Sequence, residues 1–310
     1  MTGMSLIKKT AVYIIALLLL AGASASAAEK TVGVIMTGNI PYYREIQKAF
    51  TEGLTAEGLS GKAEIIQQSP NPEPMSWTNA ARKLVAVGAD IIVSYGAPAT
   101  LAVLHETSDI PVVFAGVYDP QSIGVVGKNA TGVSSKVPIA SLLRNFKSIT
   151  GFTTLGIVYS EAEKDTLIQV NEARQQEGAL GFRSVKFNVR RAEDTSKIAH
   201  VDALFLTTGC AAMHCVNNTL GIARKARIAT ATTIGGGENS GIILTLAANP
   251  QEQGREAAKI VAKIIRGARP GAIPVQMPKR IDMIINLREA NEIGVKIPFD
   301  LLTAATRVIK

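Results

Sequence analysis

The sequence is poor in aromatic residues and in cysteine, and no segment concentrates its positive charge. Its 310 residues include two cysteines, one tryptophan, six tyrosines and eight phenylalanines, and the formal net charge is +8. Nucleic-acid-binding domains usually cluster basic side chains on one face, and those that bind single strands add aromatic side chains for base stacking. Because this chain has neither feature, we expect no binding to nucleic acid.

The chain also lacks the residue spacings of common catalytic centres. Its three histidines, His105, His200 and His214, have no partner at a metal-binding spacing, and there is no Gly-x-Ser-x-Gly elbow. The three glycines before Glu238 lack the Gly-Lys-Ser/Thr ending of a phosphate-binding loop. We therefore expect a protein that is not an enzyme and has no cofactor.

What is present begins with the pattern of an export signal. Lys8 and Lys9 precede an apolar run from Ala11 to Ala21, and the small residues of Gly22 to Ala28 follow it. This order predicts a secretory signal peptide over residues 1–28 and a periplasmic mature protein. The alternative is an uncleaved anchor, although this run is shorter than the about 20 residues of a membrane span.

Short apolar runs then alternate with longer amphipathic segments. Alternation of this kind, with runs such as Ile91 to Tyr95, is typical of parallel sheets that are buried on both faces. The predicted strands cover residues 32–36, 63–67, 91–95, 112–117, 155–159, 184–189, 203–207, 228–232 and 242–246. The predicted helices cover residues 42–57, 77–87, 98–106, 139–149, 166–177, 217–225 and 251–266.

This plan is repeated on either side of residue 149. We predict an α/β fold with two doubly wound parallel-sheet lobes, joined by multiple hinge crossovers. The N-terminal lobe is expected to contain residues 29–148 and 250–275, and the C-terminal lobe residues 149–249 and 276–310. Open parallel sheets bind ligands beyond the carboxyl ends of their strands, so we expect a ligand between the lobes.

Two blocks of sequence resemble a known family. The first is IPVVFAGVYDP from Ile110 to Pro120, continued by NATGV from Asn129 to Val133. The second block consists of RGARP from Arg266 to Pro270, IPV from Ile273 to Val275, IINLREA from Ile284 to Ala290 and GVKIP from Gly294 to Pro298. Together they resemble the ABC-transporter substrate-binding proteins of the tryptophan-binding-protein type, which have the type I periplasmic binding protein fold.

The resemblance implies a monomeric protein that captures a small molecule, such as an amino acid or another small carboxylate or aromatic compound, and docks on an ABC permease. A subunit that passes the signal to a membrane sensor is the alternative, and an exported enzyme is the rival class. A DNA-binding repressor of similar architecture would need a helix-turn-helix before the first strand, where this chain carries the export pattern.

The loop after the first predicted strand supplies the first candidate ligand contacts. Thr37, Asn39, Tyr42 and Tyr43 are expected to reach the space between the lobes. A tyrosine ring can flank a flat apolar ligand while its hydroxyl finds a partner. Because adjacent helical residues point in different directions, we expect only one of the two tyrosines to face the ligand.

Two further strand ends of the first lobe carry candidate contacts. Gly96, Ala97, Pro98 and Ala99 open a helix, whose free N–H groups would attract a carboxylate; an ordinary strand–helix junction is the alternative. Asp119 precedes a proline, so it is either a hydrogen-bond acceptor for the ligand or a purely structural turn residue.

The second lobe offers polar groups at three predicted strand ends. Ser160 and Glu161 follow one strand, Thr208 and Gly209 follow another, and Glu238 follows a third. Either glutamate could oppose the ammonium group of an amino acid. The alternative is a solvated loop glutamate.

The two cysteines lie close together in the sequence. Cys210 and Cys215 are separated by four residues that include Met213 and His214. An exported protein favours a disulfide, but residues five apart in a regular helix lie about 8–9 Å apart, beyond disulfide reach. A disulfide in a loop, two free buried thiols and a soft-metal site therefore stay open as alternatives.

Overall fold

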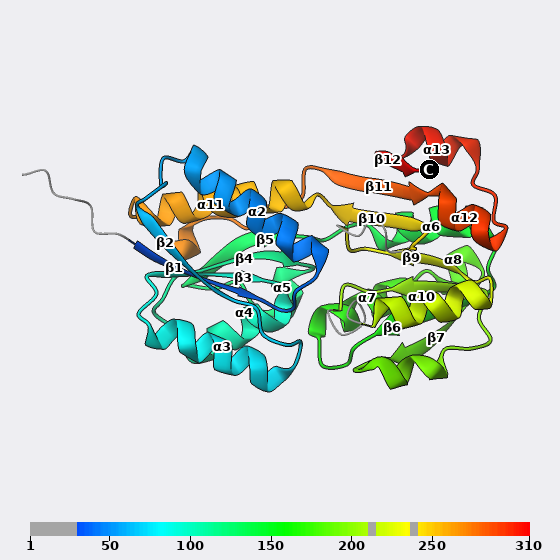
Figure 1. The fold of residues 1–310 in the computed structure, drawn as a ribbon, viewed down its shortest axis with the longest axis horizontal. Helices are drawn as coiled ribbons and strands as arrows, with labels where there is room; N and C mark the ends of the chain where they lie inside the picture. Colours follow the sequence, from blue (N-terminus) through cyan, green and yellow to red (C-terminus); the bar gives the residue numbers. More distant parts are fainter. Residues whose placement is uncertain (1–29, 210–214, 236–240) are drawn as a thin grey trace, which may run out of the picture.

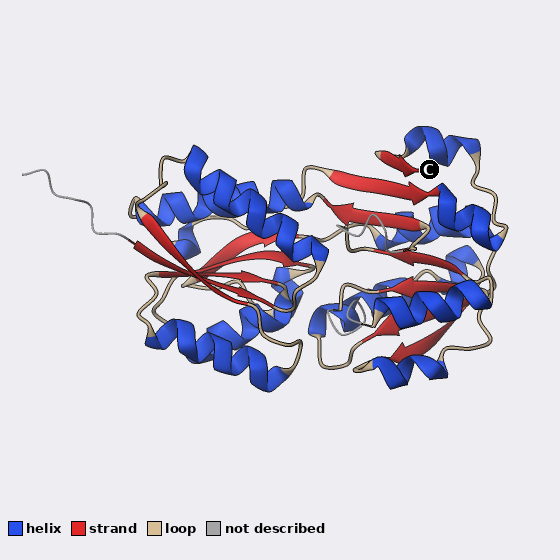
Figure 2. Cartoon of the chain, in the orientation of Figure 1, coloured by secondary structure: helices blue, strands red, loops and turns tan. Residues whose placement is uncertain are grey.

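The computed structural model describes residues 30–209, 215–235 and 241–310. Over these ranges the chain forms two α/β lobes that lie side by side, each built on its own central sheet (Figures 1 and 2). The predicted fold class is confirmed. Within the described ranges, no helix is both long enough and apolar enough to cross a membrane.

The first lobe is built on a five-stranded sheet. Its strands are β1 Lys30–Met36, β2 Ala63–Gln68, β3 Ile91–Tyr95, β4 Val112–Val117 and β5 Ala130–Ser134. They lie in the order β2-β1-β3-β4-β5, and all neighbours are parallel. Strands β3 and β4 are buried along their whole length, as expected for a parallel sheet covered on both faces.

Helices cover both faces of this sheet. They are α2 Pro41–Ala56, α3 Pro74–Ala86, α4 Ala97–Glu106, α5 Pro120–Ile123 and α11 Pro250–Ile265, with a short 3-10 turn η2 at Pro270–Ala272. Helices α2 and α11 pack together on one face, while α3 and α4 cover the other (Figure 1). Helices α2 and α11 approach closely because Gly254 lies against the backbone of Ile46, where a Cβ atom would overlap the carbonyl oxygen.

The second lobe has a seven-stranded sheet in the order β12-β11-β10-β9-β8-β6-β7. Its strands are β6 Thr154–Tyr159, β7 Arg183–Asn188, β8 Ala203–Leu206, β9 Ala229–Thr232, β10 Leu244–Ala248, β11 Ile281–Asn286 and β12 Arg307–Ile309. Strand β11 runs antiparallel to β10, so this sheet is mixed and not wholly parallel as predicted. The reversal arises because the chain enters β11 from the first lobe.

The helices of the second lobe are α6 Ile139–Thr150, α7 Lys164–Arg174, α8 Glu177–Leu180, α10 Val216–Lys225, α12 Leu287–Ile293 and α13 Phe299–Ala304, with a 3-10 helix η1 at Ala192–Lys197. The apolar face of α6 carries Leu142, Leu143 and Phe146, which pack into one core with Leu155 and Phe205 of the second sheet. The predicted division placed most of α6 in the first lobe. The chain instead leaves that lobe before α6 and not at residue 148.

The chain passes between the lobes along three segments. The first crossing is residues 135–138, between β5 and α6, and the second is Asn249, between β10 and α11. The third is residues 273–280, between η2 and β11. Three separate crossings restrict the lobes to bending about one hinge region, whereas a single linker would let them move freely.

Candidate functional site

The two lobes meet along the edge where the strands of the first sheet end. The arrowheads of β1, β3 and β4 point toward the second lobe (Figure 1). Side chains of the second lobe reach across: Ile168 of α7 packs against the apolar cluster of Ala97 and Val117, and Ile234 packs into the core around α2. Farther out, a pocket of about 510 Å³ is lined by Asn71–Glu73 of the first lobe and by Arg190–Glu193, Cys215 and Asn218 of the second. We call this junction the interlobe cleft.

The part of this junction that the first lobe contributes, which we call the first face, consists of the loop after β1 and the start of α4. The Thr37 hydroxyl donates a hydrogen bond to the Tyr95 carbonyl oxygen at 2.8 Å and accepts one from the Ala99 N–H at 3.2 Å. The Trp77 indole N–H donates to the Thr37 carbonyl oxygen at 2.7 Å. The predicted contacts Thr37 and Ala99 are therefore brought together, although their mutual hydrogen bond already occupies the Ala99 N–H.

Gly96 lies at the centre of the first face. Its φ of +88° is a conformation that side chains rarely adopt, and a Cβ atom there would overlap the hydroxyl groups of Thr37 and Tyr43. Gly96 is the N-cap residue of α4 and supplies no side-chain cap, and Pro98 occupies the first turn. Such a helix start presents a positive dipole end, and it is buried here together with Ala97.

The two adjacent tyrosines point to different places, as expected. Tyr43 lies with its hydroxyl next to Gly96, and its ring stacks on Tyr95 at 6.4 Å. The Tyr42 hydroxyl instead donates to the Ala248 carbonyl oxygen at 3.3 Å, beside the second crossing. Burial raises the pKa of Tyr42, and the nearby carboxylates of Glu45 and Asp282 raise it further. Tyr43 is thus the tyrosine of the first face, and Tyr42 belongs to the hinge.

Two other predicted contacts of the first lobe are engaged elsewhere. The Asn39 side chain is exposed and accepts a hydrogen bond from Arg44 at 2.9 Å. Asp119 caps α5 through the Ser122 N–H at 3.1 Å and pairs with Lys136 at 2.6 Å. Partial burial acts to raise the pKa of Asp119, but the bonds from Lys136 and Ser122 outweigh it and lower that pKa. The geometry of Asp119 is that of the structural alternative.

The part of the junction that the second lobe contributes, which we call the second face, consists of the loops after β6, β8 and β9 and the first turn of α7. The Thr166 hydroxyl donates to the Ser160 carbonyl oxygen at 2.6 Å, and this contact holds the end of β6 against α7. The Gln169 amide donates to the Thr208 hydroxyl at 2.6 Å and accepts from the Thr208 N–H at 3.2 Å. Gly209 lies against Thr166 and Glu163. Ser160, Thr208 and Gly209, which are predicted ligand contacts, therefore meet at one place.

Two buried carboxyl groups of the second face were not predicted. Glu163 and Asp165 are each 2% exposed, at the start of α7. The Asp165 carboxylate accepts hydrogen bonds from the Thr166 N–H at 3.1 Å and the Thr208 hydroxyl at 3.4 Å, and both donors are neutral. Burial raises the pKa of Asp165 to about 6. The acidic run of residues 161–165 directly after a strand was the available signal, but it did not indicate which acids are buried.

Glu161 differs from these two acids. It lies at the exposed rim of the second lobe, where it pairs with Arg190, and its N–H donates to the Asn188 side chain at 3.1 Å. Glu238, the other predicted partner for an ammonium group, lies outside the described residues.

The cysteine prediction is only partly covered by the structure. Cys210 lies outside the described residues, whereas Cys215 carries a free thiol that is 4% exposed and packs in an apolar cluster with Val158 and Leu206. Burial raises the pKa of this thiol. Within residues 30–209, 215–235 and 241–310, no group of three or more His, Cys, Asp or Glu side chains could hold a metal ion.

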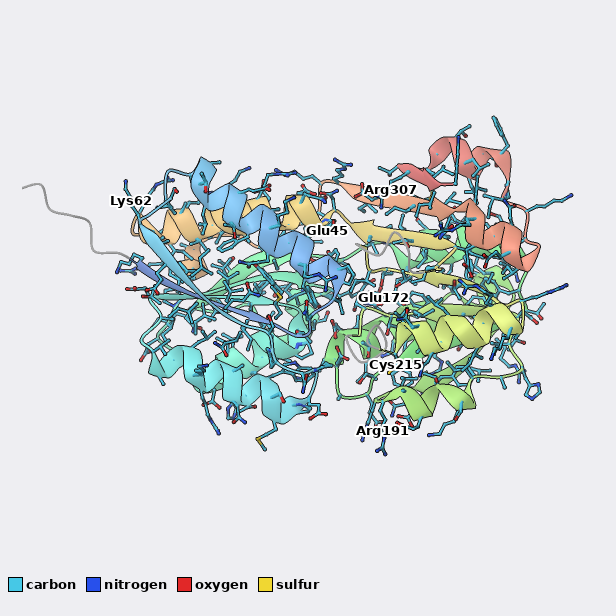
Figure 3. All side chains as sticks on the ribbon, viewed as in Figure 1. Glu45, Lys62, Glu172, Arg191, Cys215 and Arg307 are labelled. Carbon is cyan, nitrogen blue, oxygen red and sulfur yellow. The ribbon has the colours of Figure 1, made fainter. Side chains whose placement is uncertain are left out.

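A polar link across the lobes was also not predicted. The Tyr118 hydroxyl, at the end of β4, donates to Glu172 of α7 at 2.6 Å, and Lys136 of the first crossing lies 3.1 Å from the same carboxylate. Glu172 lies on the side of the second lobe that faces the first (Figure 3). Because Lys136 also pairs with Asp119, this link joins β4, the first crossing and α7.

Comparisons with known proteins agree with this architecture. The family model described as "ABC transporter substrate binding protein" matches residues 31–309. No curated protein matches the chain.

Three solved structures show the same fold. A conserved domain protein from Vibrio cholerae is 23% identical, with a TM-score of 0.86, 90% of this chain covered and 99% of that one. The ABC domain in complex with L-Trp from Streptococcus pneumoniae is 24% identical, with a TM-score of 0.85, covering 91% and 100%. A solute-binding protein from Bacillus halodurans with bound myo-inositol is 11% identical, with a TM-score of 0.61, covering 87% and 99%. The fold is that of the type I periplasmic binding proteins, and the chain belongs to the ABC transporter substrate-binding protein family.

Proposed function

We propose that this protein is the extracytoplasmic solute-binding component of an ABC importer and that it captures an amino acid between its lobes without chemical conversion. The observation that supports this ligand class is the opposite chemistry of the two faces of the cleft. The first face presents a helix start and neutral groups, and the second face presents buried carboxyl groups. An amino acid carries an ammonium group and a carboxylate group on the same carbon atom, so it offers both complementary charges.

The first face suits the carboxylate end of such a ligand. The start of α4 carries the positive end of a helix dipole, and Gly96 lies there next to the hydroxyl groups of Thr37 and Tyr43. Ser135, whose N–H donates to the Val117 carbonyl oxygen at 2.8 Å, lies at the same edge of the sheet. Its hydroxyl is buried and has no hydrogen-bond partner among the described residues. Buried hydroxyl groups normally have a partner, and a ligand oxygen would supply one.

The second face suits the ammonium end. A buried carboxylate is stable only when a positive group or several hydrogen bonds compensate for its desolvation. Among the described residues, Asp165 receives hydrogen bonds only from neutral donors, so an ammonium group would add a positive charge that these residues do not supply. Its neighbours Thr208 and Gln169 hold each other in place and leave the carboxylate in a defined position.

The proposed partners and location follow from the family and from the sequence. We propose a monomer in the periplasm, exported by a signal peptide over residues 1–28, that delivers its ligand to an inner-membrane permease. A subunit that reports to a membrane sensor is the second candidate, because the same closed form would dock on either partner.

A thermal-shift screen tests the ligand class. The purified protein is heated with each of the common amino acids, with the matching acids that lack the amino group, and with apolar aromatic compounds. Ligands that bind only the folded state raise the melting temperature by an amount that follows RT ln(1 + [L]/Kd). We expect one amino acid, or a small related set, to stabilise the protein and to be recovered chemically unchanged.

The single tryptophan gives a second readout. Trp77 donates to the carbonyl oxygen of Thr37 in the first face, so occupation of the cleft should change its emission. Stabilisation by the acids without an amino group, equal to that by the amino acids, would contradict the proposed ligand class. Turnover of any ligand would contradict the proposed binding role.

A further inference from the structure

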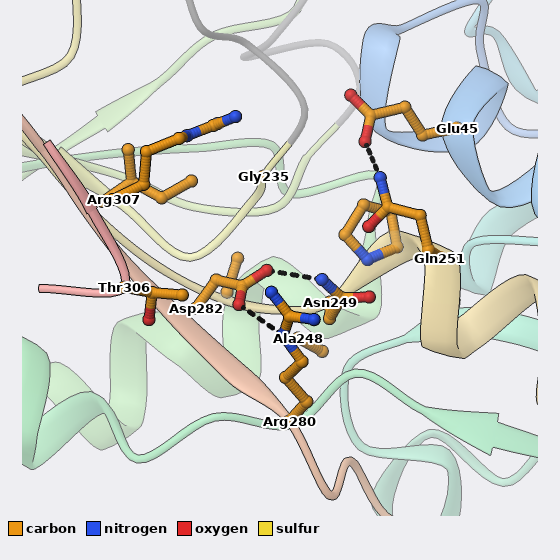
Figure 4. Close-up of a pocket in the computed structure, with 12 residues that line it drawn as sticks. Glu45, Gly235, Ala248, Asn249, Gln251, Arg280, Asp282, Thr306 and Arg307 are labelled. Atoms are coloured by element: carbon orange, nitrogen blue, oxygen red, sulfur yellow. Dashed lines mark hydrogen bonds and ion pairs between the residues drawn. The ribbon is translucent and has the colours of Figure 1, made fainter. Parts of the chain in front are cut away.

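A second cavity lies at the hinge. It has a volume of about 270 Å³, and its wall includes Gly235, which lies near the Tyr42 ring. The polar side chains of its wall come from four segments that are far apart in the sequence (Figure 4). They are Glu45 of α2, Asn249 and Gln251 at the second crossing, Arg280 and Asp282 at the end of the third crossing, and Arg307 of β12. We call this space the hinge cavity.

Charges of both signs line the hinge cavity at defined positions. The Asp282 carboxylate accepts hydrogen bonds from Arg280 at 3.0 Å and from the Asn249 amide at 2.6 Å. Across the cavity, the Gln251 amide donates to Glu45 at 2.9 Å, and the Arg307 side chain extends toward the same side (Figure 4). The wall thus offers two carboxylates and two guanidinium groups, whose charges sum to zero. A solute that carries one charge of each sign matches such a wall better than a single ion does.

The wall of the hinge cavity is shared between the lobes. Glu45 belongs to the first lobe, whereas Asp282 and Arg307 belong to the second. Bending at the crossings must change the distance between these side chains, because Asn249 and Arg280 are themselves in the hinge region. A solute that contacts both sides therefore binds one lobe arrangement better than another, and such differential binding couples two sites.

We propose that the hinge cavity is a second binding site, which takes a small zwitterion and favours closure of the lobes. Its volume of about 270 Å³ lies just below the about 300–1,000 Å³ that is usual for ligand pockets, so it suits a solute of the size of a simple amino acid. Arg280 holds the carboxylate of the solute, and Asp282 with Glu45 holds the amino group. This site is separate from the interlobe cleft, and its existence does not depend on which ligand the cleft takes.

The test uses three solutes of equal chain length. β-Alanine carries both charges, propionate carries only the carboxylate, and propylammonium carries only the amine. Binding to the purified protein is followed by calorimetry. We expect β-alanine to bind, and both single-charge solutes to bind at least about tenfold more weakly.

Variants then locate the site. Arg280→Gln and Asp282→Asn remove one charge each and should weaken β-alanine binding at least about tenfold. Ile284→Phe is a second test that breaks no polar contact, because the half-buried Ile284 lines the cavity and a larger ring fills it. Arg288→Gln and Asp300→Asn, on the exposed surface of the same lobe, are the matched controls and should bind as the unchanged protein does.

Three results would overturn the proposal. They are no binding of β-alanine, binding that all three cavity variants retain, and binding that Asp165→Asn weakens more than the cavity variants do, which would place the solute in the cleft. Coupling is tested with the cleft ligand from the thermal screen: β-alanine should lower its Kd in the unchanged protein and leave it unchanged in Ile284→Phe.

Discussion

The two faces of the interlobe cleft are built by the same kind of strand–helix junction but carry opposite chemistry. In the first lobe, the junction after β3 consists of Gly96, Ala97 and Pro98, with no acidic side chain, and its polar neighbours are already hydrogen-bonded to one another. In the second lobe, the junction after β6 buries Glu163 and Asp165. One folding unit, used twice, can therefore produce a polarised cleft through a few side chains at the helix starts.

The two faces also differ in what they contribute to stability. The first face is closely packed, and a side chain added at Gly96 has no space. The second face contains a buried carboxyl group whose ionised form is unfavourable without a positive partner. We therefore expect changes in the first face to affect folding and changes in the second face to affect mainly ligand affinity.

The largest expected effect is in the first face. Gly96→Ala should lower the free energy of unfolding by about 3–4 kcal/mol, because the new methyl group overlaps two hydroxyl groups and the backbone has a positive φ. Gly151→Ala is the matched control: Gly151 also has a positive φ, but nothing lies within 4 Å of its Cβ position. Gly151→Ala should lower the free energy of unfolding by only about 1 kcal/mol. If urea unfolding gave the same loss of stability for both variants, the first face would not be closely packed.

The next effect concerns the charge of the second face. Asp165→Asn keeps a hydrogen-bond acceptor and removes the negative charge, so it should weaken binding of the amino-acid ligand by about 1.5–3 kcal/mol, or ten- to hundredfold. The measurement is calorimetric titration, with the exposed Asp300→Asn as the control. Unchanged affinity would mean that the ammonium group, and hence the polarity of the cleft, lies elsewhere.

The pH dependence separates stability from binding in the same residue. Because burial raises the pKa of Asp165 from 3.8 to about 6, the folded protein binds more protons than the unfolded chain between these values. The stabilisation of the folded state by proton binding at Asp165 is complete below pH 3.8 and is lost as the pH rises through about 6. Affinity for an ammonium ligand should change in the opposite direction and fall as the pH drops below about 6. The melting temperature and the ligand affinity are measured between pH 4.5 and 7.5. Both should depend less on pH in Asp165→Asn than in the unchanged protein.

The smallest effect tests how the two faces are held together. Glu172→Gln should weaken the interlobe link with Tyr118 and Lys136, and lower ligand affinity by about 0.5–1.5 kcal/mol through less stable closure. Small-angle scattering should show a larger radius of gyration for this variant without ligand. Glu161→Gln, in an exposed pair with Arg190, is the control and should change neither quantity. If both variants gave the same result, the contacts of Glu172 with Tyr118 and Lys136 would not contribute to closure.

Much of the fold could be predicted from local pattern because the central strands are continuous apolar runs. Strand β5 was missed, since ATGVS has only one large apolar residue. Its position depends on distant partners: it pairs with β4, and the Thr131 hydroxyl donates to the Ile273 carbonyl oxygen at 2.7 Å. Helix α6 was given to the first lobe because its apolar stripe does not specify which sheet it covers.

The candidate site could be predicted only as far as strand ends determine position. Thr37, Tyr43 and Gly96 meet because β1 and β3 are neighbours in one parallel sheet. The burial of Asp165 depends on how α7 packs against the loop after β8, which spacing along the chain does not contain. Glu161, only four residues earlier, is exposed for the same reason.

The order in which the elements are synthesised has a consequence for folding. Helix α11 completes the core of the first lobe against α2, yet the ribosome makes it only after β6 to β10 of the second lobe. The first lobe therefore cannot complete its core, and the apolar side of α2 stays uncovered, until more than a hundred later residues have been added. Contacts so distant in sequence form slowly, and exposed apolar surface favours aggregation. Deletion of α11 should therefore destabilise the first lobe, at the beginning of the chain, more than β10 and β11, which adjoin α11 in the sequence.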